Sequence, residues 1–145
     1  MHVSRDNKYQ YLNNKIDSMN VENAKSQMRK GMLEYCVLLL LRGEPSYAND
    51  IIRRLKNANL LVVEGTLYPL LTRLKKDSLL SYEWKESQQG PPRKYYALTD
   101  EGLNWLTGLD TAWRELSNTV ECLKNNHSQN TINSNITENE KEYHD

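Results

Sequence analysis

The feature that most restricts the fold is the stretch 65–98, where a helical apolar period passes directly into two strand-like segments. A helix is expected over about residues 65–77, because four leucines, Leu67, Leu70, Leu71 and Leu74, follow the period i, i+3, i+4, i+7 of one buried helix face. Residues 79–85 and 93–98 then read as strands around a polar turn at 86–92, which ends in Gly-Pro-Pro, and this pattern is typical of a β-hairpin. A hairpin directly after a short helix leaves few architectures open.

Two further helical segments precede this stretch. Residues 26–42 are apolar almost all round in their second half, so this helix should be buried on several sides, and Gly43 ends it. Ser46 offers a side-chain oxygen to cap a short second helix over 46–58. Three helices followed by a hairpin describe a winged helix-turn-helix, in which the third helix enters the major groove of DNA.

A longer helix is expected over residues 99–124. Thr99 caps it, and two acids occupy its first turn, where the helix dipole favours them. An apolar seam follows in steps of three and four residues, as in a coiled coil, and consists of Leu106, Leu109, Trp113, Leu116, Val120 and Leu123. We therefore predict a mainly α (α+β) protein, a winged helix-turn-helix with a long C-terminal dimerisation helix.

The chain is expected to have four parts: a flexible N-terminal extension (1–25), for which weak helix is the alternative, a winged helix-turn-helix DNA-binding domain (26–98), the dimerisation helix (99–124) and a disordered acidic tail (125–145). The two outer parts are rich in Asn, Lys, Glu and Ser and poor in large apolar side chains. Translation from Met19 is a hypothesis that the sequence leaves open.

Charge is unevenly distributed along the chain. The whole chain has 19 Lys+Arg and 19 Asp+Glu, a formal net charge of zero. Residues 1–30 and 31–99 each carry +3, whereas residues 100–145 carry −6. Zero net charge therefore does not exclude a nucleic-acid partner, because the basic surplus lies in the predicted reading domain.

Two motifs resemble a known family. Residues 65–74 (Gly-Thr-Leu-Tyr-Pro-Leu-Leu-Thr-Arg-Leu) and 90–102 (Gly-Pro-Pro-Arg-Lys-Tyr-Tyr-Ala-Leu-Thr-Asp-Glu-Gly) are similar to the PadR family of bacterial transcriptional regulators. The resemblance covers about residues 26–123, and Ser78 departs from it where glycine is common. It implies a homodimer that binds promoter DNA, usually as a repressor. In some members a small aromatic or cationic compound releases the DNA.

The residues expected to contact operator DNA lie on the third helix, the hairpin and the start of the first helix. They are Gln27, Arg29, Lys30, Thr66, Tyr68, Pro69, Thr72, Arg73, Lys76, Gly90, Pro91, Arg93 and Lys94. The cations would neutralise phosphates, and the polar and apolar side chains of the third helix would meet base edges. Partial core packing of Tyr68 and a purely turn-shaping role for Gly90 and Pro91 stay open.

The expected partners are a pseudo-palindromic operator and a second copy of the chain. Trp113 is expected in the dimer core, and the alternative is an aromatic plate for a small hydrophobic or aromatic effector. The competing class is a winged helix that contacts other proteins and has no specific DNA target.

Enzymes, metals and membranes are not expected. The three histidines lie in the two outer parts of the chain, so the domain lacks a histidine for acid–base work and a His/Cys cluster for zinc. No phosphate-binding loop motif is present, and we expect no cofactor. No apolar run approaches the ~18 residues of a membrane span, and no signal peptide opens the chain, so we expect a cytoplasmic protein.

Overall fold

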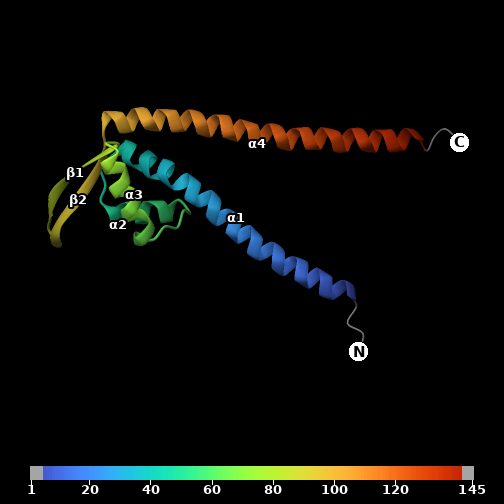
Figure 1. The fold of residues 1–145 in the computed structure, drawn as a ribbon, viewed down its shortest axis with the longest axis horizontal. Helices are drawn as coiled ribbons and strands as arrows, with labels where there is room; N and C mark the ends of the chain where they lie inside the picture. The colour runs from blue at the N-terminus through green and yellow to red at the C-terminus, as the bar shows by residue number, and fades with distance from the viewer. Residues whose placement is uncertain (1–4, 142–145) are drawn as a thin grey trace. The chain divides into compact units, whose positions relative to one another are not determined.

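The computed structural model describes the backbone of residues 5–141 and the side chains of residues 7–16 and 20–126. In chain order the elements are α1 (Arg5–Gly43), α2 (Ala48–Asn57), α3 (Glu64–Lys76), β1 (Leu80–Ser87), β2 (Gly90–Leu98) and α4 (Asp100–Lys141) (Figure 1). The chain divides into two compact units, residues 1–103 and 104–145. Three helices, the hairpin and the first turn of α4 make up the first unit, which confirms the predicted winged helix-turn-helix order.

The core of the first unit combines the apolar faces of its three helices with Leu80 of β1 and Tyr96 of β2. Val37 and Leu38 of α1 and Ile51 of α2 are fully buried. The leucine period of α3 is buried at Leu67, Leu71 and Leu74, with Leu70 partly exposed. The opposite face of α3 is therefore turned toward solvent, as the period predicts.

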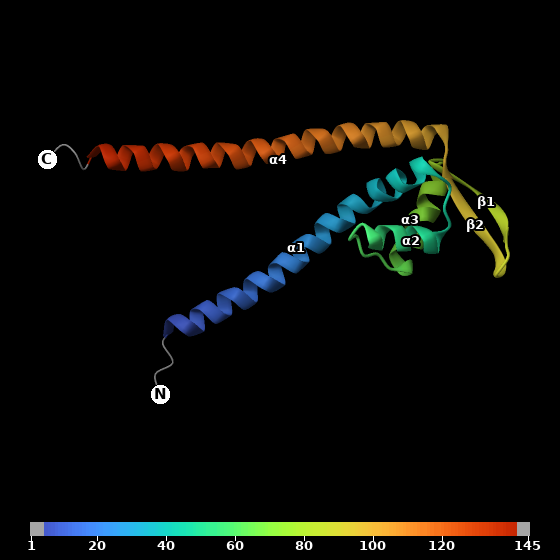
Figure 2. The same cartoon turned by 180° about the vertical axis from the view of Figure 1, so that it is seen from behind.

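The two strands form an antiparallel hairpin beside these helices. Leu80 pairs with Leu98, Tyr82 with Tyr96, and Trp84 with Lys94, so these side chains share one face of the hairpin. Both ribbon views show the hairpin projecting away from α2 and α3 as a wing (Figures 1 and 2). Its turn is tighter than the predicted 86–92, because Gly90, Pro91 and Pro92 already belong to β2.

Ser46 has a different role from the helix cap predicted for it. Its backbone N–H donates to the carbonyl of Tyr96, and the N–H of Tyr96 donates back to the carbonyl of Ser46, at 3.0 and 2.9 Å. Its buried hydroxyl accepts from Arg54 at 2.9 Å. Ser46 therefore joins the wing to the segment before α2, and the residue at the N-cap of α2 is Tyr47.

The helices α2 and α3 end in the same way. Asn59 and Ser78 each have φ of 62°, the left-handed conformation. The N–H of the following leucine donates to the carbonyl five residues back, Leu60 to Leu55 and Leu79 to Leu74. These are Schellman caps, in which the left-handed position favours glycine or asparagine. Ser78 therefore has a conformation that glycine adopts more readily, in accord with the glycine that the family resemblance leads us to expect there.

Thr99 caps α4, as predicted. Its hydroxyl oxygen accepts from the N–H of Gly102 at 3.0 Å and donates to the carbonyl of Ser78 at 2.6 Å. One side chain therefore joins the start of α4 to the end of α3.

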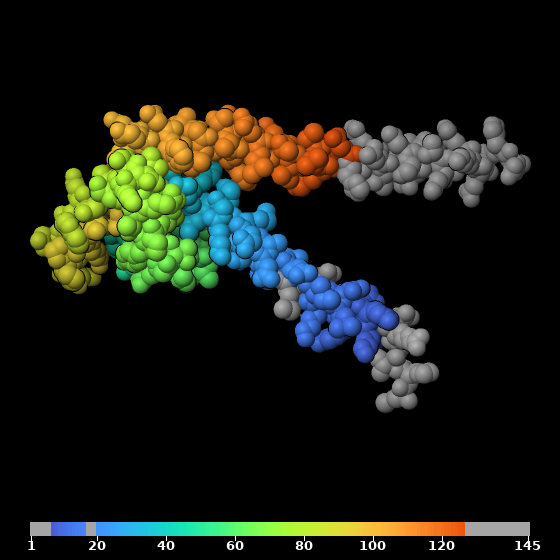
Figure 3. Space-filling view, in the orientation of Figure 1, coloured from blue at the N-terminus to red at the C-terminus, as the bar shows by residue number. Residues whose placement is uncertain are grey.

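Both outer helices are longer than the sequence patterns predict. The first helix was expected from residue 26 but begins at Arg5, so residues 5–25 of the expected flexible extension are helical. The last was expected to end at 124 but its backbone is helical to Lys141. Adding a turn to an existing helix avoids the cost of nucleation, and neither glycine nor proline interrupts 5–25 or 125–141. The N-terminal part of α1 extends beyond the α2–α3 body (Figure 3).

Candidate nucleic-acid interface

The solvent face of α3 carries five of the side chains predicted to contact DNA: Thr66, Tyr68, Pro69, Thr72 and Lys76. All five are exposed, and Tyr68 keeps 45% of its surface accessible, which limits its predicted alternative role in the core. The Thr72 hydroxyl donates to the Tyr68 carbonyl oxygen at 3.0 Å. Its oxygen can still accept a hydrogen bond, and its methyl group can still contact an apolar part of a base.

Arg73, also exposed, lies between two acids. Its guanidinium is 3.2 Å from a carboxylate oxygen of Glu34 on α1 and 3.5 Å from one of Asp77 at the end of α3. Exposed pairs of this kind contribute about 0–1 kcal/mol, so a phosphate can replace the acids at little cost. Arg73 therefore links α1 to α3 in the structure, and its exposed guanidinium can exchange these acids for another anion.

The wing holds its two predicted cations against aromatic rings. The Lys94 ammonium is 4.2 Å from the centre of the Tyr82 ring and 5.2 Å from that of Trp84. The Arg93 guanidinium is 4.4 Å from the centre of the Tyr47 ring. These cation–π contacts restrict the long side chains, so less freedom is lost when they bind an anion.

A hollow of about 370 Å³ lies between α2, α3 and the wing. It brings together four predicted site residues: Tyr68 and Thr72 of α3, and Arg93 and Lys94 of β2. Tyr96 lines it as well, and burial raises the pKa of this phenol above its usual value, so it stays neutral and able to donate. An electropositive, hydrogen-bonding recess of this kind suits a sugar–phosphate backbone.

Six lining residues of this hollow were not among the predicted site residues: Tyr47, Ala48, Asn49, Trp84, Pro92 and Tyr96. The alternation of Tyr82 and Trp84 along the strand could have indicated an aromatic wing face. Nothing in the local sequence marks Tyr47 and Asn49, because their position depends on the long-range pairing of Ser46 with Tyr96.

The predicted residues of α1 lie beside the start of α3. Gln27, Arg29 and Lys30 are exposed, and the last two line a second hollow of about 190 Å³ together with Thr66. Gly90 and Pro91 are exposed at the wing tip, outside both hollows. The residues predicted to contact DNA therefore all lie in the first unit, on α1, α3 and β2.

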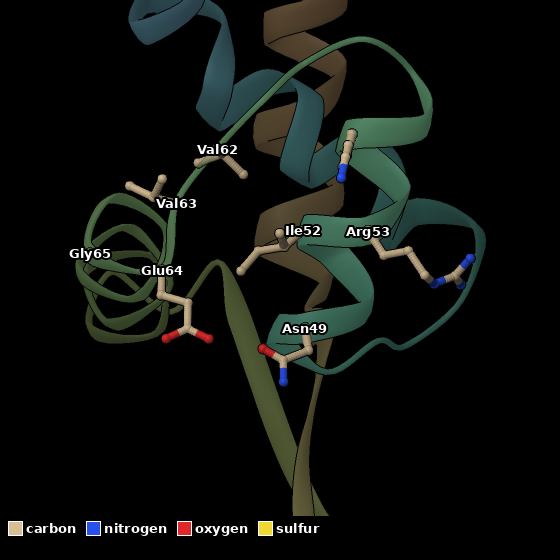
Figure 4. A pocket seen from close by; sticks show the side chains of 8 residues that line it. Asn49, Ile52, Arg53, Val62, Val63, Glu64 and Gly65 are labelled. Atoms are coloured by element: carbon tan, nitrogen blue, oxygen red, sulfur yellow. The ribbon is translucent and has the colours of Figure 1, made fainter.

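A third hollow separates α2 from the start of α3 (Figure 4). Its volume is about 760 Å³, and its lining includes Asn49, Ile52, Val63 and Glu64. Ile52 points from α2 toward α3, whereas Arg53 points away from Glu64 and pairs with Asp50.

The predicted seam of α4 differs along its length. Leu106 is buried and Leu109 is partly exposed. The remaining four residues are exposed at 44–65%: Trp113, Leu116, Val120 and Leu123. They form an apolar stripe on the described part of the second unit.

Among the described residues, no group of three or more His, Cys, Asp or Glu side chains could hold a metal ion. Within the same part of the chain, no helix is both long enough and apolar enough to cross a membrane.

Comparison with known proteins identifies the family. Residues 37–107 match the transcriptional regulator PadR-like family. A PadR-like transcription factor from Bacteroides fragilis is 67% identical, with a TM-score of 0.60, over 70% of this chain and 98% of that chain. A PadR family transcriptional regulator from Eggerthella lenta is 37% identical, with a TM-score of 0.63, over 71% and 87%.

A PadR-like transcriptional regulator from Bacillus cereus is 40% identical, with a TM-score of 0.60, over 67% of this chain and 95% of that chain. The family match over residues 37–107 spans the end of α1, α2, α3, the wing and the start of α4. It therefore includes both sequence motifs. Members of this family are DNA-binding regulators and not enzymes. The resemblance inferred from the motifs is confirmed: the chain belongs to the PadR-like family of transcriptional regulators.

Proposed function

We propose that the chain is a homodimeric repressor that binds a pseudo-palindromic operator, with α3 in the major groove and the wing along the backbone. The observation that carries this proposal is the hollow of about 370 Å³ that unites Tyr68 and Thr72 of α3 with Arg93 and Lys94 of the wing. This supports the proposal, because hydrogen-bonding side chains suited to bases and cations suited to phosphates share one hollow.

The apolar stripe of α4 supports the dimer. Trp113, Leu116, Val120 and Leu123 leave a stripe of large side chains in water at coiled-coil spacing, and a second copy of the helix would cover it. A two-fold dimer would place two α3 helices in successive major grooves, ~34–36 Å apart. Repression follows if the bound dimer occupies promoter DNA in the cytoplasm and blocks the polymerase.

The same stripe is our candidate for effector control. The exposed ring of Trp113 offers a flat apolar surface on which a small hydrophobic or aromatic compound could stack. A compound bound there would compete with helix pairing and so release the operator.

The proposed DNA contacts of α3 are tested with operator duplexes that the full-length protein selects from random DNA. Tyr68→Ala and Arg73→Ala should each weaken operator binding by about 5- to 150-fold, measured by fluorescence anisotropy, because each removes a contact worth ~1–3 kcal/mol. Circular dichroism checks that both variants remain folded.

Glu34→Gln is the matched control for Arg73. It removes the acid that Arg73 contacts on α1 but keeps the arginine. If Arg73 binds DNA, Glu34→Gln should bind the operator as tightly as the wild type or more tightly. Equal losses in Arg73→Ala and Glu34→Gln would show that only the link between α1 and α3 matters. Unchanged affinity in Tyr68→Ala and Arg73→Ala would refute the proposal that the exposed side of α3 contacts the operator.

A further inference from the structure

Val63 is an exposed apolar residue at the point where α3 begins. It holds the N-cap position in an extended conformation, with φ of −103° and ψ of 157°. Its side chain is 64% exposed, whereas its neighbour Val62 is buried at 9% exposure. The backbone thus alternates at this point and turns Val63 toward solvent.

Valine is a poor choice for this position if helix stability alone matters. Serine, threonine, aspartate and asparagine are favoured at an N-cap because a side-chain oxygen can accept from N–H groups of the first turn. Valine has no such oxygen, and its two methyl groups remain in water. A local rule broken at an exposed position indicates a use for the side chain outside the fold.

The surroundings of Val63 are those of a surface that meets nucleic acid. Val63 lines both the hollow of about 190 Å³ and the hollow of about 760 Å³. Arg29 and Lys30 line the first and Lys56 lines the second, so cations lie on both sides of the apolar side chain. If these cations bind the phosphates on the two sides of a DNA groove, the groove itself lies opposite Val63.

Glu64, the next residue, indicates which part of the DNA the start of α3 would contact, the phosphate backbone or a base edge. It is exposed beside Val63 at the mouth of the larger hollow (Figure 4). A carboxylate repels phosphates but accepts hydrogen bonds from base amino groups. The start of α3 is therefore better suited to a base edge than to the backbone.

We propose that Val63 reads the C5 methyl group of a thymine, so that each operator half-site has a thymine opposite the start of α3. This methyl is the main apolar group that base pairs present in the major groove. The proposal rests on the proposed function, because it assumes that α3 enters the major groove of an operator.

The test replaces thymine by deoxyuridine in the selected operator, one position at a time. Deoxyuridine keeps the Watson–Crick pairing and lacks only the methyl group. For the wild type, one position in each half-site should lose about fourfold in affinity, the fold-change that corresponds to burying one methyl-sized group at ~0.8 kcal/mol. In Val63→Ser the same replacement should change the logarithm of the affinity by less than about half as much as in the wild type.

Two variants keep the test clear of folding effects. Val63→Ser gains a capping oxygen, so its midpoint of thermal unfolding should not fall. Leu61→Ser removes another exposed apolar side chain that lines the same hollow of about 190 Å³, and it should keep the full response to deoxyuridine if Val63 alone contacts the methyl group.

The proposal is overturned if no thymine replacement weakens wild-type binding, or if Val63→Ser responds to deoxyuridine as the wild type does. It is also overturned if Leu61→Ser loses the response and Val63→Ser keeps it. Failure to select any specific duplex would instead refute the proposed function, so the two failures can be told apart.

Discussion

Ser78 carries a conformational cost that its counterpart Asn59 largely avoids. Both have φ of 62° at the end of a helix. The left-handed region costs an ordinary L-residue about 1–2 kcal/mol, whereas asparagine visits it more readily and glycine freely. The two Schellman caps therefore have the same geometry but unequal strain.

We expect Ser78→Gly to raise the free energy of unfolding by about 0.5–1 kcal/mol, after the entropy that glycine adds to the unfolded chain is deducted. Asn59→Gly is the matched control and should change it by less than about 0.5 kcal/mol. Urea denaturation of the full-length chain measures both. A destabilised Ser78→Gly would show that the serine side chain contributes more than its strain costs.

Gly102 has no room for a side chain. A methyl group built on it would overlap the carbonyl oxygen of Leu79, a backbone atom that itself accepts from the N–H of Thr99. We expect Gly102→Ala to lower the free energy of unfolding by about 3 kcal/mol or more, because backbone must move to accommodate it.

Gly31 provides the contrast for Gly102. It also lies within a helix, but a methyl group there meets nothing within 4 Å. Gly31→Ala should therefore stabilise the protein by about 0.5–1 kcal/mol through helix propensity. If thermal unfolding shows the two alanine variants to be alike, the contact between Gly102 and Leu79 does not exist in solution.

Residue roles that depend on near neighbours could be predicted, and those that depend on distant ones could not. The leucine face of α3 and the Thr99 cap follow from local spacing, and both are confirmed. Ser46 was wrongly predicted as a cap because its partner, Tyr96, comes fifty residues later in the chain. Arg73 reaches Glu34 on another helix, which no local pattern indicates.

At the scale of elements, apolar periods located the buried helices better than the exposed ones. The third helix was predicted over 65–77 and is Glu64–Lys76. The first was predicted to begin at 26, where the apolar density rises, but its exposed turns continue back to Arg5. A helical period of apolar residues marks the face that a helix buries. It therefore gives no signal for a helical segment that is exposed on all sides.

The hairpin shows a second limit of local patterns. Prolines at 91 and 92 favoured a long turn, but both lie within β2. In a two-stranded sheet each strand is an edge, and a proline there can turn its missing N–H side to solvent. The register shifts between the pairs Lys85–Arg93 and Ser87–Gly90, so the two prolines lie in an irregular stretch of the ladder just before its last pair.

The stripe of α4 makes a prediction about assembly. Trp113→Ala should shift the protein toward monomer in sedimentation velocity, because it removes the largest side chain of the stripe. Operator affinity should fall with it, since two half-sites are then bound separately. Arg114→Ala, the adjacent exposed residue off the stripe, should sediment as the wild type does. An unchanged dimer in Trp113→Ala would contradict pairing through this stripe.

For the whole molecule, the distribution of charge matters more than its total. The chain is neutral overall, yet residues 31–99 carry +3 and residues 100–145 carry −6. The predicted DNA contacts lie in the first unit, residues 1–103, which carries a net charge of +4, whereas the second unit, residues 104–145, carries −4. The acids should limit non-specific binding to DNA without weakening contacts made by α3 and the wing.

The central claim is that α3 and the wing bind DNA together, and the dependence of operator affinity on salt tests it most directly. Between about 50 and 200 mM salt, the logarithm of the binding constant should fall linearly with the logarithm of salt concentration. Lys94→Gln should reduce the steepness of that slope by about 0.9 per subunit, because one phosphate contact is lost. Lys124→Gln on α4 should leave it unchanged. A slope that Lys94→Gln does not alter, or that Lys124→Gln alters equally, would contradict the claim.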